Sequence, residues 1–170
     1  MIHSKLITQP KTGALAFPLL AKYVGRDDTV HNAVVLFTGS HAGTTVVRGG
    51  DCIIGHYDGN WGSVCNMGVW QHMSPGDSVV LQQRSELSDD ANVFPILARL
   101  KETGEVVLFS FTECGTVVYA PDTRPLGHYS KSWVPVHDSF RWEILAVGDS
   151  ITLVVRADGG LTALQTTAIR

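Results

Sequence analysis

The sequence has few charged residues and few cysteines. Only 17% of its 170 residues are charged, against roughly a quarter in a typical soluble domain. The 13 Lys and Arg residues and 16 Asp and Glu residues leave a net charge of -3, which argues against general binding to a phosphate backbone. The three cysteines, Cys52, Cys65 and Cys114, are too few and odd in number for a disulfide scaffold. They indicate a reducing compartment.

Long apolar runs are also missing. No stretch approaches the roughly 18 apolar residues of a membrane-spanning helix, and residues 1–13 lack the apolar core of a signal peptide. We therefore predict a cytoplasmic protein without membrane contact. Because 44% of the residues are hydrophobic, the chain can bury a core and is not disordered. Its length suits one compact domain or two very small ones.

Short runs rich in β-branched residues recur along the chain, as at 34–37, 106–109 and 151–155. Turn-forming residues bound them, for example Pro-Gly-Asp at 75–77. Nowhere does a stripe of apolar residues repeat with helical spacing, and the best helical candidate is the short polar segment 84–92. The pattern predicts an all-β, antiparallel protein.

The sequence matches itself when it is shifted by 72 residues. Across positions 34–81, 17 of the 48 aligned residues are identical, where composition alone would give roughly three. The longest identities are Val-Val-Leu-Phe, Gly-His-Tyr and Gly-Asp-Ser. Upstream, Phe-Pro-Leu-Leu-Ala-Lys at 17–22 matches Phe-Pro-Ile-Leu-Ala-Arg at 94–99. The chain is therefore predicted to contain an internal duplication, with a hairpin between the first two strands of each unit.

The duplication predicts how the chain is organised. Its expected parts are an N-terminal strand or extension at 1–13, a first β repeat at 14–83, a linker at 84–92, a second β repeat at 93–158 and a C-terminal strand at 159–170. Each repeat of about 65 residues is expected to form a small antiparallel barrel or sandwich of five or six strands, and the two are expected to pack with pseudo-twofold symmetry. Alternatively, each copy completes an edge of the other's sheet. The strand at 161–169 is expected to pair with residues 2–8.

Residues that both copies retain are the candidate ligand-binding residues. They are His56, Tyr57 and Trp61 in the first copy and His128, Tyr129 and Trp133 in the second. An imidazole beside an aromatic platform suits a planar or sugar-like ligand, held by stacking and one hydrogen bond. The alternative is structural: the glycine before each histidine sets a turn, the histidine hydrogen-bonds a neighbouring loop, and the tyrosine and tryptophan fill the core.

A second retained motif, Gly-Asp-Ser, precedes a strand in each copy. Asp77 and Asp149 are expected to accept hydrogen bonds from nearby backbone N–H groups, and the preceding glycine to supply an unusual backbone angle. This motif is interpreted as a turn rather than as a catalytic carboxylate.

Metal and catalytic sites were weighed against the duplication. Four zinc-type residues have a ligand-like spacing: Cys52, His56, Cys65 and His72. Two of these positions become Arg124 and Ile144 in the second copy, and only the pair His56 and Cys65 keeps ligand types, as His128 and His137. No Gly-x-Ser-x-Gly motif or phosphate-binding loop is present. We predict no metal, no cofactor and no catalytic residue.

The chain resembles small proteins that tailed bacteriophages encode. The resemblance rests on Val-Val-Leu-Phe followed by Thr or Ser, then Gly-Thr-x-Val, then Gly followed by His or Tyr, and then Trp, and it covers most of the chain. Those proteins have one or two such units. The resemblance implies a phage or prophage origin and a small β module in the host cytoplasm or the virion, and it carries over no catalytic residue.

These observations predict a non-enzymatic binding or assembly module. As a phage accessory protein it would bind a host factor or a small ligand, pack in a virion, or form a homo-oligomer. Two alternatives stay open: a small hydrolase-type enzyme that uses His56 or His128, and a carbohydrate-binding module that uses Trp61 and Trp133.

Overall fold

The computed structural model describes residues 15–83, 94–121 and 125–169, and every regular element in these ranges is a β-strand. The all-β, antiparallel prediction is confirmed. Within the described ranges there is no helix with the length and apolar character needed to cross a membrane. The predicted helical candidate at 84–92 and the predicted partner strand at 2–8 lie outside the described residues.

The first half of the chain forms a five-stranded antiparallel sheet. Its strands are β1 (Leu19–Tyr23), β2 (Val34–Phe37), β3 (Gly43–Val47), β4 (Tyr57–Asp58) and β5 (Trp70–His72). Their order in the sheet is β4-β3-β2-β1-β5. The expected hairpin between the first two strands forms, with Leu20 opposite Leu36.

The second half forms a five-stranded sheet with the corresponding order, β10-β9-β8-β7-β11. Its strands are β7 (Ile96–Leu100), β8 (Val106–Phe109), β9 (Gly115–Tyr119), β10 (Tyr129–Ser130) and β11 (Trp142–Ile144). Here Leu97 lies opposite Leu108. The register between the second and third strands shifts by one residue in both sheets, beside Val34 and beside Val106.

Neither five-stranded sheet closes on itself, which corrects the expectation of a barrel. The two outermost strands are β4 and β5 in the first sheet and β10 and β11 in the second. In neither sheet do these two strands pair with each other. Because those outer strands have only two or three residues, they offer little backbone for closing a ring.

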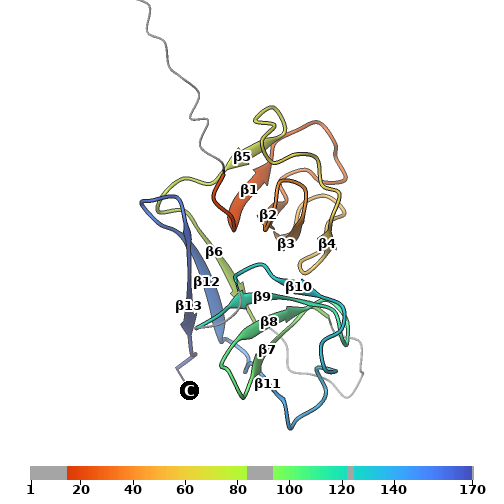
Figure 1. The fold of residues 1–170 in the computed structure, drawn as a ribbon, viewed down its shortest axis with the longest axis vertical. Helices are drawn as coiled ribbons and strands as arrows, with labels where there is room; N and C mark the ends of the chain where they lie inside the picture. Colours follow the sequence, from red (N-terminus) through yellow and green to blue (C-terminus); the bar gives the residue numbers. More distant parts are fainter. Residues whose placement is uncertain (1–14, 84–93, 122–124, 170) are drawn as a thin grey trace, which may run out of the picture.

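A third sheet joins the two halves. It contains β6 (Ser78–Gln82), β12 (Ser150–Val155) and β13 (Leu161–Thr166) in the order β13-β12-β6. A strand from the first half thus pairs with a strand from the second, with Val80 opposite Thr152. Figure 1 shows this sheet running alongside the two five-stranded sheets, which lie one above the other. The C-terminal strand pairs with β12.

Successive side chains along each strand point to opposite faces of the sheet, so they pack into two different apolar layers. Leu20, Leu36 and Leu108 belong to a central cluster that also includes residues of the third sheet. Val35 and Phe37 face the other way, into a second cluster with Trp61 and Trp70. The second five-stranded sheet has its own outer cluster, which includes Phe109 and Trp142. The central cluster is what attaches the two halves to each other.

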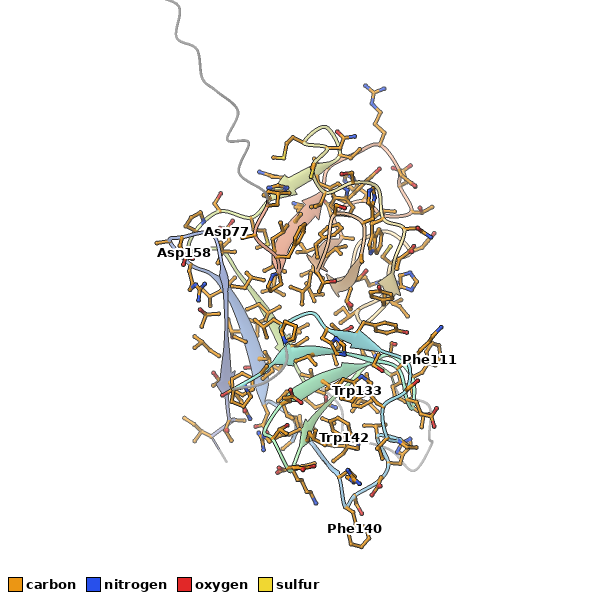
Figure 2. The ribbon with its side chains drawn as sticks, viewed as in Figure 1. Asp77, Phe111, Trp133, Phe140, Trp142 and Asp158 are labelled. Atoms are coloured by element: carbon orange, nitrogen blue, oxygen red, sulfur yellow. The ribbon has the colours of Figure 1, made fainter. Side chains whose placement is uncertain are left out.

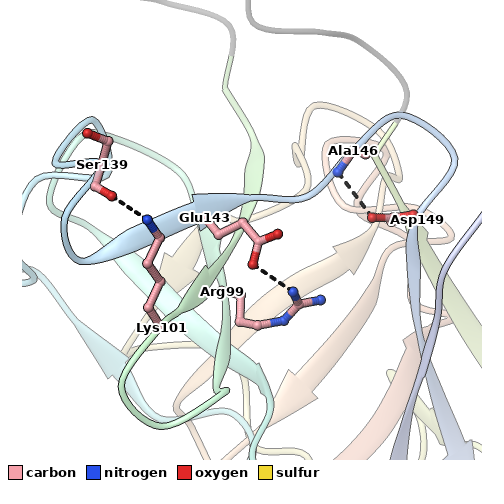
Figure 3. A network of polar contacts seen from close by, with 6 residues as sticks. All are labelled: Arg99, Lys101, Ser139, Glu143, Ala146 and Asp149. Atoms are coloured by element: carbon pink, nitrogen blue, oxygen red, sulfur yellow. Dashed lines mark hydrogen bonds and ion pairs between the residues drawn. The ribbon is translucent and has the colours of Figure 1, made fainter.

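Both Gly-Asp-Ser turns have the expected chemistry. The glycines at 76 and 148 have φ angles of 91° and 90°, and the carboxylates accept backbone hydrogen bonds, Asp77 from the Ser74 N–H and Asp149 from the Ala146 N–H. Figure 3 shows the second of these turns beside the β7–β11 pair, where an exposed ion pair joins Arg99 to Glu143 at 2.8 Å.

Candidate functional site

The Gly-His-Tyr loop of the first half is fixed by backbone hydrogen bonds to β3. The Gly55 N–H donates to the Thr45 carbonyl at 2.8 Å, and the Thr45 N–H donates to the His56 carbonyl at 2.8 Å. Gly55 has a φ of 93°, a conformation that side-chain-bearing residues rarely adopt. The glycine therefore sets the turn that presents His56 and starts β4 at Tyr57.

The loop of the second half has the same hydrogen bonds. The Gly127 N–H donates to the Val117 carbonyl at 2.7 Å, and the Val117 N–H donates to the His128 carbonyl at 2.8 Å. Gly127 has a φ of 87°. The turn-setting role expected for the retained glycine is thus found in both loops.

The two loops bring their tyrosines together. The rings of Tyr57 and Tyr129 are stacked, with centroids 3.9 Å apart and planes inclined by 8°. The hydroxyl oxygens of Thr44 and Thr116, which are fully buried, lie 2.7 Å apart in a hydrogen bond. Both contacts join residues that are 72 positions apart in the chain. The candidate site is therefore at the junction between the two halves.

A surface cavity of about 280 Å³ opens beside this stack. The residues that line it are Phe17, Thr38, Tyr57, Pro125, Leu126, His128 and Tyr129. Three of them are sequence-predicted site residues. The sequence analysis did not select the other four. A signal for two of them was present, because the sequence match aligns Phe17 with Phe94 and Thr38 with Ser110, an aromatic with an aromatic and a hydroxyl with a hydroxyl.

The two histidines are exposed and differ in their place relative to the cavity. His128 lines it and His56 does not. Each imidazole contacts a tryptophan ring edge to face. The ring centroids are 6.1 Å apart for His56 and Trp61 and 6.3 Å apart for His128 and Trp133. Neither imidazole has a hydrogen bond to another described residue, so the expected bond to a neighbouring loop is not formed within the described ranges.

The two tryptophans are held in the outer clusters. The Trp61 side chain is in the core, at 8% exposure, and its indole N–H donates to the Gly43 carbonyl at 2.9 Å. Trp133 is half-buried and donates to the Gly115 carbonyl at 2.9 Å. Figure 2 shows Trp133 and Trp142 within the second half. Trp61 does not suit a sugar-stacking platform, because it is buried.

Among the residues that line the cavity, Tyr129 has a raised pKa. Burial raises its pKa above the ordinary tyrosine value, with further contributions from a hydrogen bond with Cys114 and from the charges of Cys114 and Tyr57. Its hydroxyl therefore stays neutral, and able to donate a hydrogen bond, throughout the physiological pH range.

Metal and hydrolytic chemistry were tested against the same geometry. Among the described residues, no three His, Cys, Asp or Glu side chains gather as a metal-binding group. His72 is engaged elsewhere, since its Nε2 atom lies 2.8 Å from the Val64 carbonyl, and the Cys52 thiol donates to the Thr29 carbonyl. A hydrolase using His128 would need a carboxylate or a nucleophile beside it. The described residues that line the cavity include no carboxylate, and their hydroxyl groups are those of Thr38, Tyr57 and Tyr129.

Comparison with known proteins gave no match: no family model, no curated protein and no solved structure is similar to the chain.

Proposed function

We propose that the chain is a tandem duplication of one β unit, with its two units packed about a pseudo-twofold axis. The two five-stranded sheets have the same strand order. A residue that lies on a twofold axis meets its own equivalent, as Thr44 meets Thr116 and Tyr57 meets Tyr129. The pairing of β6 with β12 also fits such an axis, because it is centred on Val80 opposite its equivalent Thr152.

Contacts away from the axis support the same proposal, since a twofold axis makes every such contact occur twice. A Cβ atom at Gly55 would lie 3.3 Å from the Cβ atom of Ser110. A Cβ atom at Gly127, the equivalent of Gly55, would meet the Cγ2 atom of Thr38, the equivalent of Ser110. Each Gly-His-Tyr loop thus abuts the same position of the opposite unit.

The function that this geometry supports best is non-enzymatic binding of a small planar or sugar-like ligand in the cavity at the junction. The observation that carries this proposal is that the residues shared by the two halves differ in their exposure. One surface cavity is lined by Tyr57, His128 and Tyr129, whereas Trp61 is buried in the core. A volume of about 280 Å³ lies at the lower limit of ligand pockets, so the cavity suits a ligand of about one ring.

The lining offers both polar and apolar contacts to such a ligand. The His128 imidazole supplies a hydrogen bond. The hydroxyl oxygens of Thr38 and Tyr129 supply acceptors, since their protons are directed to the Ala42 carbonyl and to Cys114. Phe17 and Leu126 supply apolar surface. Ligand pockets commonly combine an apolar lining with a few placed polar groups.

We propose that the biological role of this protein is that of a phage-encoded accessory protein. The binding of a host signal molecule, contact with a host protein and a place in the virion are all compatible with a module that works through its surface.

A binding titration with a matched pair of variants tests the cavity. We expect benzoate or methyl α-glucopyranoside, a planar and a sugar-like probe, to shift the amide NMR signals of Thr38, His128 and Tyr129 in the full chain. His128→Ala should raise the Kd obtained from this titration by about tenfold, because it removes a lining imidazole. His56→Ala is the control, because it makes the same change in the other unit, outside the cavity.

Two results would count against the ligand site. One is a set of shifts that is not confined to the residues lining the cavity, with equal losses in the two variants. The other is an unfolding temperature that falls by several degrees in His128→Ala, which would give the imidazole a structural role.

A further inference from the structure

The third sheet has an edge that no described strand covers. In the order β13-β12-β6, the middle strand is paired on both sides, whereas β6 pairs on one side only. Edge strands carry unpaired N–H and C=O groups that can bind a further strand.

The hydrogen bonds at the ends of β6 establish which of its backbone groups face that open edge. The Val155 N–H donates to the Asp77 carbonyl, and the Gln83 N–H donates to the Asp149 carbonyl, both at 2.9 Å. Bonded and non-bonded pairs alternate along an antiparallel ladder, so the odd-numbered residues of β6 face β12. The N–H and C=O groups of Ser78, Val80 and Gln82 therefore point outward, away from β12.

The outer edge has none of the features that usually protect edge strands. Its sequence, Ser-Val-Val-Leu-Gln, contains no charged residue and no proline, and its pairing with β12 has no register shift. Val80, at the centre, has an exposed fraction of 59%. Lysine, proline and bulges are the common devices against edge-to-edge pairing, and their absence leaves this strand open to association.

A largely apolar groove of about 520 Å³, whose lining also includes Arg48 and Gln82, adjoins the edge. Its apolar lining includes Val46, Ile54, Phe94, Pro95, Leu97 and Leu108. Phe111, which is 67% exposed, extends this surface from Phe94, with ring centroids 6.3 Å apart. An exposed apolar surface of this kind, next to an open strand, is typical of a protein–protein interface.

The matching strand of the second half shows how such an edge is covered. β12, which matches β6 in sequence, pairs on its second side with β13. The side chain of Leu161 on β13 is buried in the central cluster, and Ala163 packs against the same cluster. The chain therefore already contains one example of a strand that covers this position, and β6 lacks it among the described residues.

We propose that β6 pairs antiparallel with β6 of a second copy of this chain, so that the two three-stranded sheets become continuous. The strand is self-complementary about Val80: in this register Ser78 lies opposite Gln82, Val79 opposite Leu81 and Val80 opposite itself. No like charges face each other, and the contact is closed by a twofold axis. The register is also the one in which β6 already pairs with its equivalent, β12. This proposal is independent of the ligand cavity.

Light scattering coupled to size-exclusion chromatography tests the proposal on the full chain. The expected mass is twice 18.4 kDa. Val80→Lys places two ammonium groups opposite each other at the centre of the contact, and we expect it to weaken the dimer by at least tenfold. Leu164→Lys is the matched control: it places the same charge on β13, at the opposite edge of the sheet and at a residue 52% exposed, and the dimer should persist.

Hydrogen exchange keeps the test decisive if Val80→Lys folds poorly. In the unmodified chain the amides of Ser78, Val80 and Gln82 should be protected at high concentration and lose that protection on dilution. A mass of one chain at every concentration would overturn the proposal, and would leave the edge to a different protein. A dimer that Leu164→Lys disrupts and Val80→Lys does not would equally overturn it.

Discussion

Gly55 and Gly127 occupy the same position in the two loops that meet at the junction, but their surroundings differ by one methyl group. A Cβ atom at Gly55 would make a tight contact with the Ser110 Cβ atom, at 3.3 Å, whereas one at Gly127 would overlap the Thr38 Cγ2 atom outright. Both glycines have a positive φ, so any substitution strains the backbone at either position. The methyl group of Thr38 adds a steric cost at Gly127 only.

This difference predicts an unequal pair of variants. Gly55→Ala should lower the free energy of unfolding by about 1–2 kcal/mol through backbone strain alone. Gly127→Ala should cost about 1–3 kcal/mol more because of the added overlap. Urea denaturation measures both values.

A double variant identifies the cause. Adding Thr38→Ser to Gly127→Ala removes the methyl group and copies the residue at the equivalent position, Ser110. The double variant should then be about as stable as Gly55→Ala. An equal loss in the two alanine variants, or no recovery in the double variant, would contradict the close packing of Gly127 against Thr38.

At the scale of single elements, the two Gly-Asp-Ser turns share a sequence but differ in burial. Asp77 is exposed and accepts one backbone hydrogen bond, from the Ser74 N–H. Asp149 is 5% exposed and accepts hydrogen bonds from the Ala146 and Ala168 N–H groups. The second carboxylate thus ties the β12 turn to the segment that follows β13.

Thermal unfolding of variants that lack one of these carboxylates should show that Asp149 contributes more stability than Asp77. Asp77→Ala should lower the free energy of unfolding by about 1 kcal/mol, the usual cost of one exposed turn hydrogen bond. Asp149→Ala should cost about 2–4 kcal/mol, because it leaves two backbone donors without their charged acceptor in a buried site. Equal losses in the two variants would mean that Asp149 contributes no more than a surface turn residue.

The strands themselves could be predicted from the sequence, because the information that defines them is local. Runs such as Val34–Phe37 are β-branched and apolar and end at turn-forming residues, and their repetition in the second half gave the strand set twice. The order of strands in each sheet could not be predicted in this way. β5 pairs with β1 rather than with its chain neighbour β4, and this pairing comes with a contact between Trp70 and Phe37, which are far apart in the sequence.

The candidate site could be predicted only in part for a related reason. Retention in both copies selects residues that either the core or a site requires, and it does not distinguish the two. Trp61 and Tyr57 were equally good candidates in the sequence, yet one is covered by its own unit and the other reaches the junction. Phe17 and Pro125 reach the cavity through the packing of one unit on the other, which no local pattern encodes.

At the scale of the whole molecule, the account depends on how the two halves are packed together. A small β unit of about 65 residues buries too little surface to be more than marginally stable alone. Here the third sheet combines one strand of the first half with two of the second, and the central cluster includes both Leu20 and Leu97. The same packing creates the cavity, so loss of the junction would remove the proposed ligand site as well.

The most direct test of this packing is an NMR measurement of short proton–proton distances across the junction. The pseudo-twofold arrangement predicts nuclear Overhauser effects in reciprocal pairs: Gly55 with Ser110 and, equally, Gly127 with Thr38. It also predicts effects between the Tyr57 and Tyr129 rings, which lie on the axis. Observation of one member of the reciprocal pair without the other, or of neither, would contradict the proposed symmetry and with it the site at the junction.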